Sequence, residues 1–298
     1  LFGNTNQRVT FGFPSTQTIF VGWAFKMATL PGGNVTLCNF WGPGGVIHGF
    51  LRITSTASLE WVNVGAVRAS TAGGVVLANT FHYLEVMVTI SQSSGEVIIK
   101  VDNNEEANVT GVDTFNSGEG EFCNAIAFLG TNHQIDDVYM LNDAGSAPYN
   151  TFLSDVRIEA VLPDADGNAT EFDATFPVSP TNHFSKVDEA TPDDDTTYNE
   201  TATPNDIDLF DYAALPTIVG GATVLGVKAI CLANKQDAGD APFRLLTRPV
   251  ATNQNGVIAH QPAVDYHYDF EIWEDNPETS SPWLESEVDA AEFGVQAL

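Results

Sequence analysis

Two alternating apolar runs, separated by a polar break, dominate residues 81–102. Alternation with a period of two is typical of a β-strand that buries one face and exposes the other. The shared face of the two runs carries Leu84, Val86, Val88, Ile90, Val97, Ile99 and Val101. The break reads SQSSG, and its Gly95 can adopt the positive φ that a tight turn needs. The pattern predicts an antiparallel hairpin that lies on a core.

Shorter segments of the same kind fill the rest of the first half, and Gly, Pro and Ser separate them. They lie at residues 8–13, 18–27, 35–41, 46–54, 58–64, 66–70, 123–129 and 134–141. No segment repeats apolar residues at helical spacing. Many short strands at regular intervals favour a β-sandwich over a parallel α/β sheet. Residues 103–120 are polar and acidic and predict a loop.

The distribution of apolar, acidic and proline residues divides the chain into three regions. The alternating residues 154–162 predict a strand that closes a first domain, 1–163. Residues 164–206 are rich in proline and acid, which favours either a solvated linker or an arm that reaches a neighbouring domain or subunit. Residues 207–298 predict a second β-sandwich domain. Its expected strands are 207–212, 217–233, 243–247, 266–273 and 288–295.

Three segments of the first half carry a resemblance to a known family. They are the hairpin that opens with Phe81-His82-Tyr83, the strand TIFVGWAFKM (18–27) and the strand AIAFLGTNHQIDDVYMLND (125–143). Together they resemble the laminin-G-like, concanavalin-type jelly rolls. The resemblance implies a lectin-like jelly-roll sandwich in the first domain. It implies little about activity, because this fold carries lectins, glycosidases and structural modules alike.

The net charge of the chain excludes some classes of binding partner. The 298 residues hold 39 Asp and Glu against 11 Lys and Arg, a formal net charge of -28. So negative a surface repels nucleic acid and anionic lipid, and it suits a saline or halophilic medium in which salt screens self-repulsion. No apolar run approaches the ~20 residues of a membrane-spanning helix, so no membrane insertion is expected.

The three cysteines, Cys38, Cys123 and Cys231, have no CxxC spacing, which disfavours a zinc site. Cys38 and Cys123 both fall in predicted strands of the first domain. They either pair or stay buried as free thiols, and both alternatives are open.

Catalysis is not expected. Jelly-roll glycosidases use Glu-x-Asp-x-x-Glu on a strand, and the nearest match here begins at Glu171 and Asp173. Its last position is Phe176, so the proton donor to the leaving group is absent. We predict that the chain is not an enzyme and has no catalytic residues.

A weak calcium candidate follows the first domain. Asp164, Asp166 and Asn168 offer alternating oxygen ligands on a glycine-containing turn, but Thr175 stands where a bidentate glutamate would complete the loop. The alternative is an Asx-rich turn without metal. The jelly-roll resemblance implies that Asp136 fixes a neighbouring turn and that His82 packs or forms hydrogen bonds.

A second resemblance spans most of the chain. The segments that carry it are IDDVYMLND (135–143), NTFLSDVRIEAVLPDADG (150–167), PDDDTTY (192–198), IDLFDY (207–212) and SEVDAAEFGVQ (286–296). They resemble structural proteins of tailed-virus particles. This implies a virion component (capsid decoration, turret or head fibre, or tail protein) that oligomerises on the particle surface with copies of itself and other virion proteins.

The competing hypothesis is a carbohydrate-binding lectin module, with or without calcium, that adheres to host surface glycans. Its warrant is the fold class together with Trp41, Trp61 or Trp283 as platforms on which a sugar ring could stack. Binding to an array of glycans, with and without EDTA, distinguishes the two hypotheses.

Overall fold

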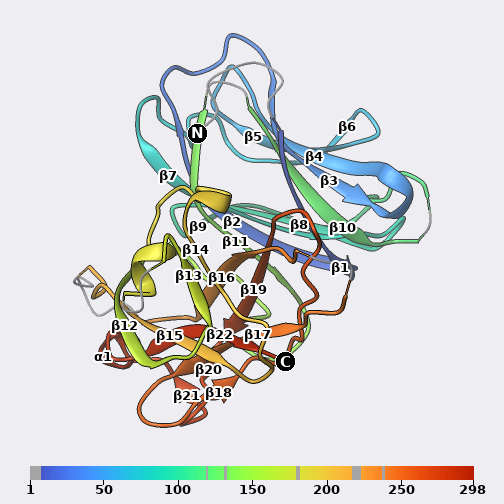
Figure 1. The fold of residues 1–298 in the computed structure, drawn as a ribbon. Coiled ribbons are helices and arrows are strands. Elements are labelled where there is room, and N and C mark those ends of the chain that lie inside the picture. The colour runs from blue at the N-terminus through green and yellow to red at the C-terminus, as the bar shows by residue number, and fades with distance from the viewer. Residues whose placement is uncertain (1–7, 119, 131–132, 179–181, 217–222, 237–238) are drawn as a thin grey trace. The chain divides into compact units, whose positions relative to one another are not determined.

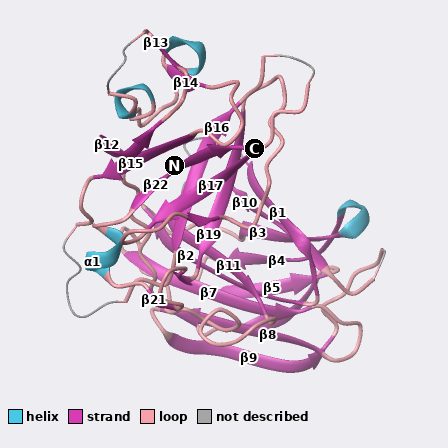
Figure 2. Ribbon diagram, turned by 60° about the horizontal axis from the view of Figure 1, so that its bottom comes forward, coloured by secondary structure: helices cyan, strands magenta, loops and turns pink. Residues whose placement is uncertain are grey.

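The computed structural model describes residues 8–118, 120–130, 133–178, 182–216, 223–236 and 239–298. Strands make up nearly all regular structure in these ranges, and their single α-helix, α1 (Glu285–Val288), has four residues. The chain divides into two compact units, residues 1–158 (unit 1) and residues 159–298 (unit 2). Figures 1 and 2 show the strands of both units, and the predicted all-β class is confirmed.

Unit 1 consists of two antiparallel sheets. A six-stranded sheet has the order β1-β10-β3-β4-β5-β6, and a five-stranded sheet has the order β11-β2-β7-β8-β9. The strands of the first sheet are β1 (Arg8–Thr16), β3 (Val35–Gly42), β4 (Val46–Ile53), β5 (Leu59–Asn63), β6 (Ala66–Ser70) and β10 (Cys123–Leu129). Those of the second are β2 (Thr18–Met27), β7 (Phe81–Thr89), β8 (Gly95–Val101), β9 (Asn104–Val112) and β11 (His133–Asn142).

One continuous apolar core lies between the two sheets and draws side chains from both. From β2 it takes Val21, Trp23 and Phe25, which the alternation of that strand places on one side. The predicted hairpin is present as β7 and β8, with Val86 opposite Ile99. Unit 1 is thus a sandwich in which each strand buries one face.

Residues 152–158 form a strap over the outer face of the five-stranded sheet. The prediction of a closing strand at 154–162 is wrong, since this segment forms no strand in the structure. Phe152 packs edge-to-face on Phe20, with ring centroids 5.2 Å apart. Ile158, predicted to point inward, is 54% exposed.

Side chains rather than a strand ladder hold the strap. The buried Glu85 carboxylate accepts hydrogen bonds from the Tyr139 hydroxyl and from Ser154 N, the latter at 2.9 Å. The same hydroxyl accepts Leu153 N at 3.1 Å. Tyr139 fits because it lies against Gly22, where a Cβ would come within 2.2 Å of its ring. The backbone N–H groups of the strap therefore find partners without pairing to another strand.

Replacing Tyr139 with Phe removes one donor to Glu85 and one acceptor for the strap. Because each of the two lost hydrogen bonds costs ~1–2 kcal/mol at a buried group, we expect unit 1 to lose ~2–4 kcal/mol of stability and the strap to become sensitive to protease. Chemical denaturation and limited proteolysis measure both effects. The control is Tyr268→Phe, at an exposed position of unit 2. Wild-type proteolysis of the Tyr139 variant would contradict this account.

Two further expectations for unit 1 need correction. Residues 103–120, predicted as a loop, contain β9, which pairs with β8 and packs Ala107 and Val109 against the core. The acidic residues of this strand made the segment resemble a loop in composition, although its apolar residues lie on one face. In addition, β1 continues past Pro14, because an edge strand tolerates a residue without an N–H.

Unit 2 is built on a five-stranded antiparallel sheet with the order β12-β15-β22-β17-β18. Its strands are β12 (Pro163–Thr170), β15 (Ile207–Tyr212), β17 (Phe243–Arg248), β18 (Gln254–Asn255) and β22 (Glu292–Ala297). Three two-stranded sheets accompany it: β13 (Ala174–Phe176) with β14 (Tyr198–Glu200), β16 (Val227–Ala233) with β19 (His267–Trp273), and β20 (Asp275–Asn276) with β21 (Ser281–Pro282).

The segment 164–206, predicted as a linker or arm, is instead part of unit 2. It supplies most of β12, which pairs with β15, and both strands of the β13-β14 ribbon. Its acidic side chains accept hydrogen bonds from backbone N–H groups, so they order the segment rather than solvate it. The boundary between the units accordingly lies at residue 158, ahead of the predicted 163.

The core of unit 2 is small and joins two layers. Its buried members are Leu245, Trp273, Trp283, Ala291 and Phe293. Side chains from one face of β16 pack against them, so the β16-β19 ribbon covers one side of the five-stranded sheet.

The strands of unit 2 start later than predicted at two places. Of the strand expected at 217–233, residues 217–222 lie outside the described ranges, and β16 begins at Val227. The strand expected at 288–295 begins at Glu292, because α1 and a turn precede it.

Candidate functional site on the six-stranded sheet of unit 1

The outer face of the six-stranded sheet gathers polar and aromatic side chains from five strands. The register aligns Thr36, Arg52, Glu60 and Ser70 in one row, and aligns Thr10, Ala127, Asn39, Phe50 and Val62 in the next. A third row holds Gly12, Ala125, Trp41 and Ile47. Their neighbours along each strand, such as Phe40, Leu51 and Trp61, point into the core. This outer face is the candidate site.

A fixed ion pair occupies one end of the site. Arg52 Nε donates to Glu60 Oε2 at 2.7 Å, and one terminal nitrogen of Arg52 lies 2.6 Å from the same oxygen. Both side chains are partly exposed, at 22% and 17%. Because both contacts use one carboxylate oxygen, Glu60 Oε1 remains as an acceptor and the other guanidinium N–H groups remain as donors, with no partner among the described hydrogen bonds.

An aromatic platform lies at the other end. Trp41 is half-buried on the outer face of β3, and the guanidinium carbon of Arg8 lies 5.8 Å from its ring centroid. Arg8 comes from the edge strand β1, which reaches Trp41 through β10. An arginine over a tryptophan ring is a favourable cation–π arrangement.

The structure separates the three tryptophans that the sequence offered as platforms. Trp61 is fully buried in the core of unit 1, and Trp283 is 2% exposed in the core of unit 2, where its Nε1 donates to Trp273 O. Neither can stack on a ligand, so those two assignments are wrong. Trp41 remains.

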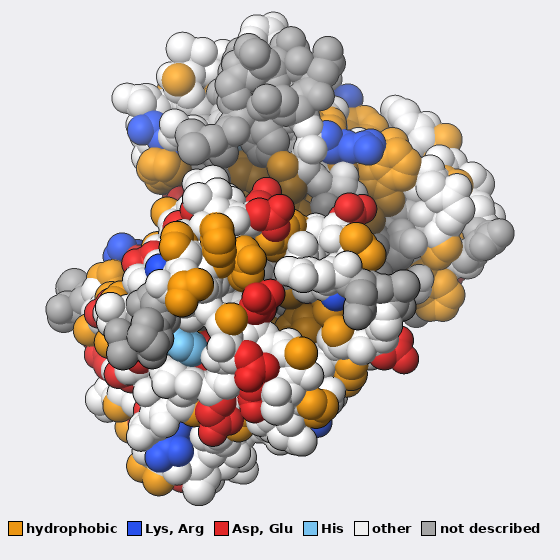
Figure 3. Space-filling model, viewed as in Figure 1, with side chains coloured by type: hydrophobic (Ala, Val, Ile, Leu, Met, Phe, Trp, Pro, Cys, Tyr) orange, Lys and Arg blue, Asp and Glu red, His pale blue; other side chains and the backbone are white. Residues whose placement is uncertain are grey.

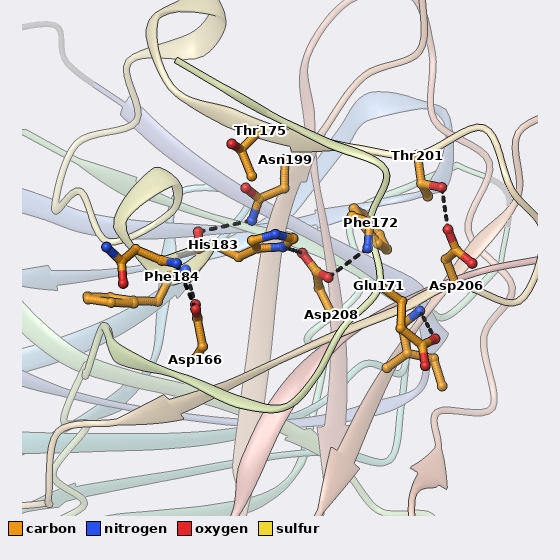
Figure 4. Close-up of polar contacts among 12 residues, drawn as sticks. Asp166, Glu171, Phe172, Thr175, His183, Phe184, Asn199, Thr201, Asp206 and Asp208 are labelled. Carbon is orange, nitrogen blue, oxygen red and sulfur yellow. Dashed lines mark hydrogen bonds and ion pairs between the residues drawn. The ribbon is translucent and has the colours of Figure 1, made fainter. Parts of the chain in front are cut away.

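The calcium candidates do not converge on one point. Asp166 accepts the backbone N–H groups of Asn182 and Phe184 at 2.9 and 2.7 Å, as Figure 4 shows for Phe184. Asn168 bonds to Glu292 instead, and Asp164 is exposed. Across the described ranges no group of three His, Cys, Asp or Glu side chains is placed to hold a metal ion.

The carboxylates of the glycosidase-like segment accept hydrogen bonds from another part of the same chain. Glu171 accepts Ile207 N at 3.0 Å, and Asp173 accepts the Thr201 hydroxyl at 2.9 Å. The Thr201 hydroxyl bond is the main cause that lowers the pKa of Asp173, supported by two further bonds to the same loop. Both groups are therefore committed as acceptors to the 201–207 turn.

A buried His–Asp pair lies beside them (Figure 4). His183 Nδ1 lies 2.8 Å from Asp208 Oδ2, and the other oxygen of Asp208 accepts Phe172 N at 3.0 Å. Burial raises the pKa of Asp208, while these bonds oppose the rise. The pair joins β15 to the 172–183 segment, and its burial keeps it from a ligand.

His82 forms hydrogen bonds, as its position in the family implied. Its Nδ1 lies 2.7 Å from Asp102 Oδ2, and its Nε2 accepts Leu77 N at 2.9 Å. Of the two acidic residues in β11, the one that reaches another segment is Asp137, which accepts a hydrogen bond from Ile158 N at 2.8 Å. Asp136 accepts the N–H of the next residue, so the role expected of Asp136 falls largely to its neighbour.

Cys38 and Cys123 are free and buried in unit 1, so the structure favours the thiol alternative over a disulfide. Within the described part of the chain, no helix is long and apolar enough to cross a membrane.

Comparisons with known proteins add the following. No protein-family model matches the chain, and no curated protein is similar to it. Among solved structures, sheep galectin-11 in complex with glycerol has a TM-score of 0.31 and 11% identity, over 47% of this chain and 100% of that one. A tetrameric galectin from the ball sponge Cinachyrella sp. has a TM-score of 0.34 and 9% identity, over 45% and 99%.

A third similar structure is the heptameric SAP-like pentraxin from Limulus polyphemus, with a TM-score of 0.34 and 12% identity over 47% of this chain and 73% of that one. The two antiparallel sheets of unit 1 confirm the predicted lectin-like sandwich. None of the comparisons supports the resemblance to tailed-virus proteins.

Proposed function

We propose that unit 1 binds carbohydrate through the outer face of its six-stranded sheet. The observation that carries the proposal is the Arg52–Glu60 pair, which is held on β4 and β5, next to the strand β3 that carries the half-buried ring of Trp41. Sugars expose hydroxyl groups that both donate and accept hydrogen bonds, and they expose apolar C–H faces. The site offers a partner for each.

The ion pair suits hydroxyl recognition because its two halves have opposite roles. Glu60 Oε1 accepts from a hydroxyl, and the outward N–H groups of Arg52 donate to the same or the adjacent hydroxyl. Since each side chain already fixes the other, a ligand does not have to order them, and that lowers the entropic cost of binding. Phe50 and Trp41 add apolar surface along the same face.

Replacing Glu60 with Gln keeps the shape of the side chain but removes its charge. A hydrogen bond to a charged group contributes ~1.5–3 kcal/mol, so we expect the affinity for the best glycan of an array to fall at least about tenfold. Titration calorimetry with that glycan measures the effect, with an EDTA arm to test calcium. The matched control is Glu96→Gln, on the five-stranded sheet.

Two results would overturn the proposal. One is the absence of binding by the unaltered chain to every glycan on the array. The other is equal binding by the unaltered chain and the Glu60 variant, since the site would then lie elsewhere.

The virion role remains a separate prediction from the sequence resemblance. No contact or surface in the described residues favours it, and its test is the oligomeric state of the purified chain and its presence on a particle.

A further inference from the structure

The two sheets of unit 1 differ sharply in charge. The six-stranded sheet contains Arg8, Arg52 and Arg68 and a single acidic residue, Glu60, so its strands have a net charge of +2. The strands of the five-stranded sheet contain two lysines and six acidic residues, a net charge of -4. Figure 3 shows acidic side chains at several places on the face of the molecule that it displays. A chain of formal charge -28 thus keeps one sheet almost free of acid.

The three arginines of this sheet have different commitments. Arg52 is paired with Glu60, and Arg68 lies 3.5 Å from Asp113. Arg8 is exposed and, among the ion pairs of the described residues, has no carboxylate partner. Its one described contact is with the ring of Trp41. A positive group remains available on the aromatic platform of the candidate site.

We propose that the carbohydrate taken by this site is acidic, with a carboxylate or sulfate group that Arg8 binds beside Trp41. The inference rests on the proposed carbohydrate-binding function and adds the class of sugar. The single acidic residue of these strands, Glu60, is paired with Arg52, so an anion beside Arg8 meets less repulsion than it would elsewhere on this chain. The planar guanidinium matches both carboxylate and sulfate through paired N–H donors.

Matched polysaccharides that differ only in charge test the proposal. Polygalacturonate is compared with its fully methyl-esterified form, and dextran sulfate with dextran, so the two arms distinguish carboxylate from sulfate. We expect at least one acidic member to bind about tenfold or more tightly than its neutral counterpart. We also expect that preference to shrink as NaCl is raised from about 0.05 to 0.5 M, because salt screens exposed charges.

Arg8→Ala then locates the charge that is responsible. We expect this variant to lose the preference, so that it binds the acidic and the neutral member equally. The matched control is Lys26→Ala, which removes the same charge from a cation that also lies over an aromatic ring, 5.1 Å from the Phe81 centroid, but on the five-stranded sheet. Arg8 is exposed on an edge strand, and Lys26 lies near the end of β2 against the exposed ring of Phe81, so neither variant should unfold unit 1.

The outcomes separate the two proposals. Equal binding of acidic and neutral members overturns the acidic class and leaves carbohydrate binding intact. A preference that survives in Arg8→Ala, or that Lys26→Ala abolishes equally, overturns the role of Arg8. If the unaltered chain binds neither these polysaccharides nor any glycan of the array, the proposed function fails, and the acidic class fails with it.

Discussion

Replacing Phe293 with Ala is expected to unfold unit 2 at a temperature where unit 1 stays folded. Phe293 lies at the centre of the small core of that unit, with the rings of Tyr212, Trp273 and Trp283 at centroid distances of 5.7, 6.0 and 6.4 Å. Truncating a buried Phe to Ala costs ~3–5 kcal/mol, which approaches the whole stability of many domains of this size. The core has few other residues to compensate.

Calorimetry measures this effect as the shift of one unfolding transition, and hydrogen–deuterium exchange of peptides from residues 159–298 assigns that transition to unit 2. The control is Phe293→Leu, which keeps most of the buried volume and should cost less than about 1.5 kcal/mol. An alanine variant that melts like the unaltered chain would show that the described core does not hold unit 2 together.

The stability of unit 1 is expected to fall steeply above pH 9. Burial raises the pKa of the Cys38 and Cys123 thiols to about 12. Between the ordinary thiol pKa and 12, the unfolded chain loses both protons while the folded chain keeps them. The unfolded state then binds fewer protons, so the free energy of unfolding decreases with pH, by ~1.4 kcal/mol per thiol and pH unit. The stabilisation is complete below pH 9 and is lost on approach to pH 12, ~4 kcal/mol for each thiol.

Urea titrations of the unaltered chain and of the Cys38→Ala, Cys123→Ala double variant measure this dependence. The double variant should start less stable and show a slope that is smaller by the contribution of two thiols. Replacing Cys231 in unit 2 is the control, and it should leave the transition of unit 1 unchanged. Parallel slopes for the double variant and the unaltered chain would contradict the assignment.

The sequence predicted well the elements whose contacts are local. The hairpin of β7 and β8 follows from alternation and one glycine turn, and the inward side of β2 follows from alternation alone. Prediction from the sequence failed where side-chain hydrogen bonds hold a segment in place of backbone pairing between strands. The strap at 152–158 alternates like a strand, yet its partners are Glu85 and Tyr139, some 14 to 69 positions away in sequence. No periodicity encodes such contacts.

The acidic segment 164–206 shows a related difficulty. Its carboxylates were interpreted as solvated charges, whereas Asp166 and Glu171 each hold backbone N–H groups of distant turns. An acidic residue that accepts such bonds and one that faces water have the same local sequence. Composition therefore suggested a linker where the chain is ordered.

Part of the candidate site was within reach of the sequence. Arg52 and Glu60 flank a short polar turn on consecutive alternating segments, so pairing those segments as a hairpin would have placed the two residues opposite each other. The contact of Arg8 with Trp41 could not be predicted from the sequence. It depends on β10 lying between β1 and β3, and β10 comes more than 80 residues later in the chain than β3. Sequence order does not predict that neighbour.

The unequal charge of the two sheets also bears on how unit 1 meets a charged polymer. Two sheets of one sandwich whose strands have net charges of +2 and -4 contribute an electric dipole that runs across the core of unit 1. A diffusing polyanion exerts a torque on that dipole and turns the sandwich before contact, so productive encounters outnumber those expected from random collision. In concentrated salt this orientation disappears over distances beyond a few ångströms, and the association rate then reflects collision alone.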